Sequence, residues 1–128
     1  MQASITTPGG DRRDVGAEGI GAALQAGEFF WLDLRIDPHD AEEPIGVLRE
    51  VFKFHPLAVE DAEHFGQRPK FDDYDEYGYM VVFGAGDDAR GPKEVHLFVS
   101  EDFVVTLHRG ACRSLDAVHA RLARHHLG

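Results

Sequence analysis

The chain has 128 residues, of which 43% are hydrophobic and 28% charged, as expected for about one folded domain. Its formal net charge is −10, from 23 acidic residues against 13 Lys plus Arg, which argues against a nucleic-acid partner because phosphates attract basic surfaces. Cys112 is the lone cysteine, so an internal disulfide is excluded, and no run approaches the roughly 18 apolar residues of a membrane span. We therefore expect a soluble domain from a reducing compartment.

The first half of the chain predicts a tail followed by two helices and a strand. Residues 1–14 are polar and rich in Gly and Pro, so we expect a flexible N-terminal tail, with the domain itself covering residues 15–128. A weak apolar stripe predicts a helix over residues 17–26, and the aromatic run at 29–34 predicts a strand. Asp40 and Glu43 have the spacing of a capping box, and the apolar stripe from Ile45 to Phe52 predicts the helix that follows.

The second half predicts a short helix, three strands and a last helix. Pro56 suits a first helical turn and Gly66 suits a helix end, which together predict a helix over residues 56–65. Short apolar runs at 77–83, 94–99 and 103–107 predict strands joined as hairpins, and an apolar stripe at 115–122 predicts the last helix. The pattern indicates an α/β fold with a mixed β-sheet sandwiched between helices, an α/β/α arrangement.

The helix at 56–65 carries several potential metal ligands. At 100° per residue, Glu60, Glu63 and His64 project opposite the apolar face, and Asp61 falls at its boundary. Carboxylate oxygens are ligands for hard cations such as magnesium, but one helix cannot complete the coordination shell. A second element or subunit would have to supply the rest. The alternative is a solvated helix face, stabilised by a Glu60–His64 side-chain pair.

Other polar clusters are weaker candidates for a site. The acidic run at 72–76 is typical of a solvated turn before a strand. His119, His125 and His126 fit the polar surface of the last helix, where they could catch a transition metal only adventitiously. We expect Cys112 to be inert.

Five segments together resemble the cytoplasmic N-terminal domain of the CorA family of divalent-cation (magnesium and cobalt) transporters. They are HPLAVEDA (55–62), QRPK (67–70), YDEYGYMVVF (74–83), FFWLDL (29–34) and FVVTLHRG (103–110). The resemblance implies an α/β/α domain that precedes a stalk helix and two membrane helices in a pentamer. No Gly-Met-Asn pore signature and no membrane helix occur in this chain, so we expect it to correspond to the regulatory part alone, at the cytoplasmic face of the membrane.

The resemblance also implies roles for individual residues. Glu60 and Asp61 would help bind a divalent cation at the boundary between neighbouring subunits, and His64 is a further candidate ligand. A second group would be structural: His55, Pro56, Gln67, Arg68, Pro69, Lys70 and Tyr74. Within this group, Arg68 and Lys70 would balance nearby acids. Glu63, Gly66 and Gly78 depart from the family's usual residues at those positions.

The implied ligand is Mg2+, with Co2+, Ni2+ or Zn2+ as further candidates, and the implied partners are other copies of the subunit. Because the second half of the shell is absent, we expect weak magnesium binding by this chain alone, at about millimolar concentration or above. Three alternatives remain open. The first is a ZntB-like zinc transporter domain, which the eight histidines suggest because imidazole suits zinc. The others are a metal-assisted hydrolase and a structural interaction domain. We do not expect an enzyme, since no catalytic set is recognisable.

Overall fold

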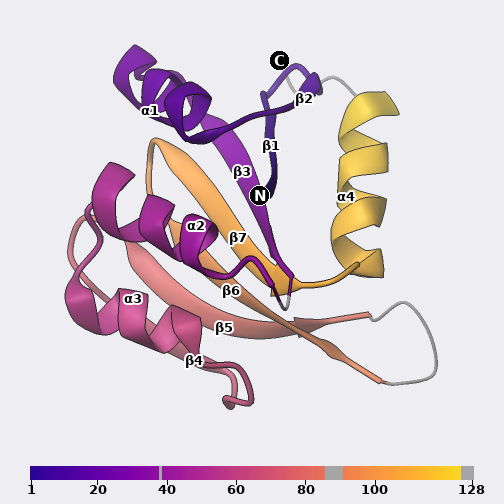
Figure 1. Ribbon diagram of the computed structural model, residues 1–128. Coiled ribbons are helices and arrows are strands. Elements are labelled where there is room, and N and C mark those ends of the chain that lie inside the picture. Colours follow the sequence, from indigo (N-terminus) through magenta and orange to yellow (C-terminus); the bar gives the residue numbers. More distant parts are fainter. Residues whose placement is uncertain (38, 86–90, 125–128) are drawn as a thin grey trace.

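A seven-stranded mixed sheet separates two helical layers in the computed structural model, which describes residues 1–37, 39–85 and 91–124 (Figure 1). The strand order is β2-β1-β3-β7-β6-β5-β4. Helices α1, α2 and α3 lie on one face of the sheet, and α4 lies on the other. The predicted α/β/α arrangement is therefore confirmed. The strands are β1 (Gln2–Thr6), β2 (Arg12–Asp14), β3 (Phe30–Ile36), β4 (Lys70–Asp73), β5 (Gly78–Gly84), β6 (Lys93–Val99) and β7 (Phe103–Arg109).

The helices are α1 (Ala17–Ala26), α2 (Glu42–Gly46), α3 (Pro56–Glu63) and α4 (Arg113–Arg124), with a π-helical turn, η1 (Val47–Val51), directly after α2. The central pair β3 and β7 is parallel, and every other pair in the sheet is antiparallel. The main core lies between the sheet and α1–α3, where Leu32, Leu34 and Val105 meet Ile20 and Leu48. All five are fully buried.

The N-terminal segment is not the flexible tail that its composition predicts. Residues Gln2–Thr6 form β1, which pairs with β3 so that Ile5 lies beside Leu32. Residues Arg12–Asp14 return as β2 along its outer edge, and Arg12 Nε donates a hydrogen bond to Ser4 Oγ at 3.0 Å. A polar strand can be buried here because its backbone is paired on both sides. The domain therefore begins at residue 2 rather than at residue 15.

The predicted capping box of the second helix does not form. The helix begins at Glu42 with Ala41 at its N-cap, and no side chain caps it. The Asp40 carboxylate instead accepts the terminal amino group of Met1 at 2.8 Å. After Gly46 the helix widens into η1, in which Phe52 N–H donates to Val47 O at 3.1 Å. The amino group of Met1 thus binds the Asp40 carboxylate, which the sequence spacing predicted to cap the helix.

The three predicted strands correspond to β5, β6 and β7, but β4 was not predicted. Lys70–Asp73 pairs with β5, so half of the acidic run expected to be a solvated turn is strand. A Cβ at Gly78 would lie 2.7 Å from the Phe71 ring, which accounts for glycine at this position of β5. Among the described residues, no helix is both long and apolar enough to cross a bilayer.

Candidate functional site

Helix α3 starts at a site built by His55, Pro56 and two tyrosines. His55 Nδ1 accepts a hydrogen bond from Leu57 N–H at 3.1 Å, so the imidazole acts as the N-cap. Its own backbone N–H donates to the Tyr77 hydroxyl at 2.9 Å. The Tyr74 ring stacks on Tyr77 and lies 5.5 Å from the His55 ring. These contacts fix where α3 begins relative to the β4–β5 hairpin.

The end of α3 is held by Gln67 and Glu94. Gln67 Nε2 donates to the carbonyl oxygens of Asp61 and His64, both at 2.6 Å, and so satisfies two carbonyls of the last turn. The Glu94 carboxylate from β6 accepts the backbone N–H groups of Gly66 and Gln67, at 2.8 and 3.2 Å. Gly66 adopts φ +97°, a conformation in which a side chain would be strained. Both helix ends are therefore tied to the sheet.

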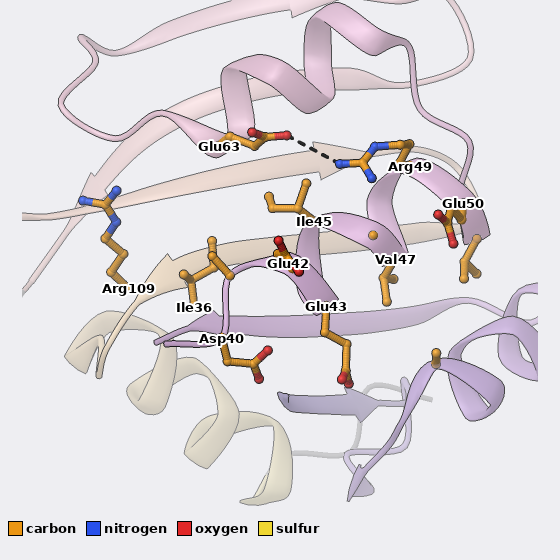
Figure 2. Close-up of a pocket in the computed structure, with 14 residues that line it drawn as sticks. Ile36, Asp40, Glu42, Glu43, Ile45, Val47, Arg49, Glu50, Glu63 and Arg109 are labelled. Atoms are coloured by element: carbon orange, nitrogen blue, oxygen red, sulfur yellow. Dashed lines mark ion pairs between the residues drawn. The ribbon is translucent and has the colours of Figure 1, made fainter. Parts of the chain in front are cut away.

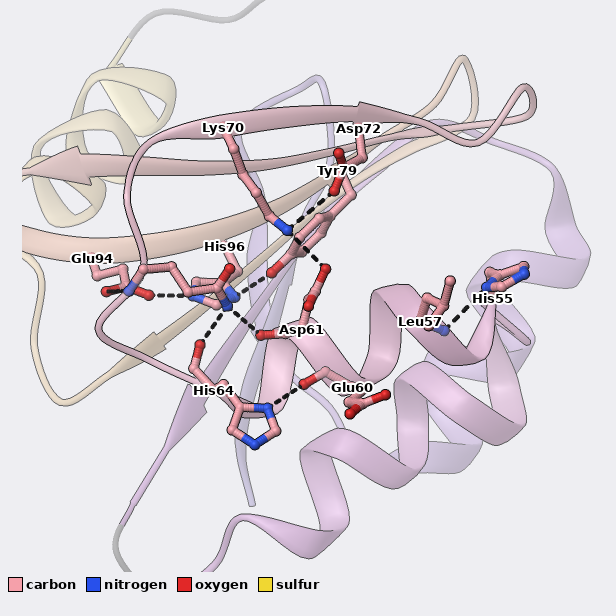
Figure 3. A network of polar contacts seen from close by, with 11 residues as sticks. His55, Leu57, Glu60, Asp61, His64, Lys70, Asp72, Tyr79, Glu94 and His96 are labelled. Atoms are coloured by element: carbon pink, nitrogen blue, oxygen red, sulfur yellow. Dashed lines mark hydrogen bonds and ion pairs between the residues drawn. The ribbon is translucent and has the colours of Figure 1, made fainter.

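Glu60 and Asp61, here called the α3 carboxylate pair, face different surroundings (Figure 3). The Glu60 side chain is exposed and extends away from the network, and it makes no ion pair with the residues that the structure describes. Asp61 lies at the edge of the buried face, as predicted, with 38% of its side chain exposed. Its Oδ2 accepts a hydrogen bond from the Lys70 ammonium at 2.8 Å, and the same ammonium lies 3.2 Å from Asp72 Oδ2.

His64 and Glu63 do not join the α3 carboxylate pair. His64 Nδ1 contacts the backbone oxygen of Glu60 at 2.7 Å, so the predicted Glu60–His64 side-chain pair is wrong. A backbone carbonyl is available at this position because the helix ends there. Glu63 reaches Arg49 on η1 at 3.6 Å. Arg68 and Pro69 are exposed. Arg68 and Lys70 were expected to balance nearby acids, and within the described chain it is Lys70 that makes such ion pairs.

A buried polar network lies directly behind α3, on β5 and β6. His96 Nε2 donates to Glu94 Oε2 at 2.6 Å, and its Nδ1 accepts from the Tyr79 hydroxyl at 2.7 Å. Phe65 stacks on the His96 ring at 4.3 Å. Burial lowers the pKa of His96 and raises the pKa of Tyr79, so both groups are neutral near pH 7. The polar groups of this network are therefore paired with one another behind α3.

The oxygen donors present fit part of a magnesium shell. Magnesium is typically bound through one or two carboxylates with several retained waters, and the α3 carboxylate pair can supply these two. Among the described residues, no cluster of three or more His, Cys, Asp or Glu side chains could hold a metal ion. The donor set suits a hard cation that completes its shell elsewhere.

A groove of about 940 Å³ opens beside this site, along α2 and η1 (Figure 2). Its walls carry Glu42, Glu43 and Glu50, and the Arg49–Glu63 ion pair crosses toward α3. The groove is acidic and open, and most of its lining comes from residues 40–51.

The opposite face of the sheet holds a buried polar network that was also not predicted. Asp33 Oδ1 accepts the Thr106 hydroxyl at 2.6 Å, and His108 Nε2 lies 2.9 and 3.0 Å from the two Asp33 oxygens. Trp31 Nε1 donates to Thr106 Oγ1 at 2.9 Å. The spacing of 75 residues between Asp33 and His108 gives no local signal in the sequence. Asp33 and His108 also line a cavity of about 400 Å³.

His119 corrects the prediction of a polar helix surface. It is 7% exposed and stacks on Trp31 with ring centres 3.9 Å apart, which docks α4 against the sheet. His125 and His126 lie outside the described residues. Cys112 is a free, buried thiol.

The model of the family "CorA-like Mg2+ transporter protein" matches residues 26–128. A "Putative metal ion transporter YfjQ" from Bacillus subtilis (strain 168) is 38% identical over 94 residues, which is 73% of this chain and 28% of that protein. The chain thus spans less than a third of the length of this curated relative.

Solved structures share the fold, and two of them serve as examples. The full-length CmaX protein matches with a TM-score of 0.73 and 18% identity, over 97% of this chain and 39% of that one. The soluble domain of CorA from Methanocaldococcus jannaschii matches with a TM-score of 0.69 and 6% identity, over 98% of this chain and 47% of that one. At these identities the likeness concerns the fold alone, whereas the family match covers most of the chain. The chain therefore belongs to the CorA-like Mg2+ transporter protein family.

Proposed function

We propose that this chain is the cytoplasmic regulatory domain of a CorA-like magnesium or cobalt transporter and senses divalent cations at the boundary between subunits. The observation that carries the proposal is the α3 carboxylate pair: Glu60 is exposed and unpaired within the described chain, and the partly exposed Asp61 lies beside it. Two oxygen donors at a surface can bind a cation firmly only if another surface provides the remaining ligands. A neighbouring copy of the chain would supply them.

The acidity of the chain gives this arrangement a way to act. Each copy carries a formal charge of −10, so five copies in a ring repel one another. Salt screens this repulsion at distances beyond about 8 Å. Divalent cations between adjacent copies would offset the repulsion and favour the packed, closed ring. The cation then controls gating only through its higher affinity for the closed state. Loss of the cation would loosen the ring and open the pore.

The proposal is tested in a longer chain that carries the stalk and membrane helices. The readout is the magnesium concentration at the midpoint of two changes: the protection of the assembled protein from limited proteolysis, and the loss of ion flux. We expect Asp61→Ala and Glu60→Ala each to raise this midpoint by about tenfold, the size of a typical coupling between two sites. Glu63→Ala is the matched control, because it removes the same charge from α3 but from a side chain that pairs with Arg49.

The outcome that would contradict the sensing role is a midpoint unchanged by Asp61→Ala and Glu60→Ala, and it would favour a structural interaction domain. Competition calorimetry on the same longer chain separates the metals, since tight zinc binding without a magnesium response would favour a ZntB-like domain. The proposal assigns no enzymatic activity. If the chain hydrolysed phosphoesters and Asp61→Asn abolished this hydrolysis, the proposal that the chain has no enzymatic role would be contradicted.

A further inference from the structure

The Lys70 ammonium lies between two carboxylates that come from different elements. Its Nζ is 2.8 Å from Asp61 Oδ2 on α3 and 3.2 Å from Asp72 Oδ2 on β4 (Figure 3). The Tyr79 ring covers a third side, with its centre 5.4 Å from the ammonium. Two carboxylate oxygens and an aromatic face thus converge on one point, and a cation that belongs to the chain fills it.

Charge and chemistry make this point a cation position rather than an incidental contact. Lys70 Nζ donates a hydrogen bond to Asp61 Oδ2 at 2.8 Å, and because both groups are charged this contact is stronger than a neutral hydrogen bond. Asp72 and Lys70 are two residues apart on β4, so their side chains share one face of the sheet. The Lys70 ammonium offsets the repulsion between the Asp61 and Asp72 carboxylates, which lie near each other.

We propose that Lys70 is a built-in competitor for divalent cations at Asp61, and that its displacement sets the cation concentration to which the site responds. The inference rests on the proposed function in one respect, that Asp61 is a divalent-cation ligand. It adds that the ligand is already neutralised when no metal is bound. A magnesium ion must therefore displace an ammonium as well as lose water.

The ammonium can be displaced because it is not deeply buried. A third of the Lys70 side chain is exposed, at 33%, and an exposed ion pair holds its partners only weakly. The flexible four-carbon stem lets the ammonium move to solvent without a change in the backbone. Asp61 and Asp72 would then offer the one or two carboxylates with which magnesium is typically bound. Removal of the ammonium should therefore strengthen binding even in this chain alone.

The test is binding of Mn2+ by electron paramagnetic resonance, with Mg2+ as the competing ion, to the 128-residue chain. We expect Lys70→Met to bind about tenfold more tightly than the unchanged chain, because the local charge becomes more negative by one unit. Lys70→Gln should behave in the same way, so the test does not depend on one variant folding. Lys70→Arg should stay weak, because it keeps a cation between the carboxylates.

Two controls separate competition from a general change in charge. Lys53→Met removes the same charge from an exposed residue before α3 and should leave Mn2+ affinity unchanged. Lys70→Met with Asp72→Asn removes the ammonium and one carboxylate together, and should lose the gain. Thermal unfolding of each variant with and without Mg2+ gives a second readout, in which Lys70→Met gains more from the metal than the unchanged chain does.

Equal Mn2+ affinity for the unchanged chain, Lys70→Met and Lys70→Gln would overturn the inference, as would an equal gain from Lys53→Met. These outcomes are distinct from failure of the proposed function. If neutral residues at position 70 tighten binding but Asp61→Ala leaves the proteolysis midpoint unchanged, Lys70 competes at a site that does not control gating. If they do not tighten binding but Asp61→Ala shifts the midpoint, the sensing role stands and the competition does not.

Discussion

Asp33 and His108 illustrate how single residues in this fold are committed to structure. Both His108 ring nitrogens face oxygen atoms, those of the Asp33 carboxylate and the Gly110 carbonyl oxygen at 2.7 Å. Burial alone would raise the pKa of Asp33, but the contacts with His108 outweigh it and lower this pKa below 3.8. Asp33 and His108 thus form a buried polar pair that joins β3 to β7.

Asp33→Asn should therefore destabilise the fold strongly. Asn cannot replace both carboxylate oxygens that contact Thr106 and His108, and removal of one partner of such a buried pair costs about 3 kcal/mol of unfolding free energy by urea denaturation. Because the pKa of Asp33 is lowered, the unchanged chain keeps this stability above pH 3.8 and loses it as the pH falls through the lower folded value. Asp37→Asn is the matched control, since this carboxylate is 38% exposed and pairs with Arg35 at 3.6 Å. Equal losses for the two variants would contradict the account.

An aromatic contact helps to hold helix α4 on the sheet, together with the hydrogen bond from Ala85 N–H to Ser114 Oγ at 2.7 Å. His119 stacks flat on Trp31, at an angle of 3°, and within the described part of the chain neither of its ring nitrogens has a hydrogen-bond partner. Burial lowers the pKa of His119, Arg12 on β2 lowers it further, and Asp33 and Asp116 oppose this change. The helix is therefore docked by a neutral imidazole, and protonation weakens the docking.

His119→Phe should make the fold less sensitive to mild acid. The pKa of His119 is below its ordinary value of 6.5 in the folded chain, so the unfolded chain takes up the proton first and stability falls as the pH drops below 6.5. A phenylalanine keeps the stacked ring but cannot be protonated. Urea denaturation at about pH 8 and about pH 5.5 should show a smaller loss for the variant than for the unchanged chain. Identical losses would show that His119 does not carry this dependence, which would leave His96 as its source.

The elements that sequence analysis predicted have local patterns, which range from the weak apolar stripe of α1 to the marked ends of α3. The helix at 56–65 was placed correctly to within two residues because Pro56 and Gly66 mark its ends. The strands β1, β2 and β4 were not predicted, because they are short and polar and their stability comes from pairing with distant strands. The Asp40–Glu43 capping box failed for a related reason, since Asp40 binds the distant amino group of Met1.

At the scale of the whole molecule, the acidic surface and the α/β/α layers followed from composition and pattern, but the electrostatics of the site did not. Spacing placed Asp61 at the boundary of the buried face, where the structure has it. Spacing could not reveal that Lys70 and Asp72 meet Asp61 across the α3–β4 connection, because that contact depends on where β4 lies. The sequence therefore predicted that Lys70 balances nearby acids, but not that Asp61 and Asp72 are those acids.

The most direct measurement is the position at which a divalent cation binds this chain, found by Mn2+-induced broadening of amide NMR signals. The account predicts that signals of residues 60–64 and 70–72 broaden first, and more strongly in Lys70→Met. The acidic groove along α2 and η1 provides the internal comparison, because Glu42, Glu43 and Glu50 offer as much negative charge. Broadening centred on those three residues, with α3 unaffected in both chains, would contradict the account.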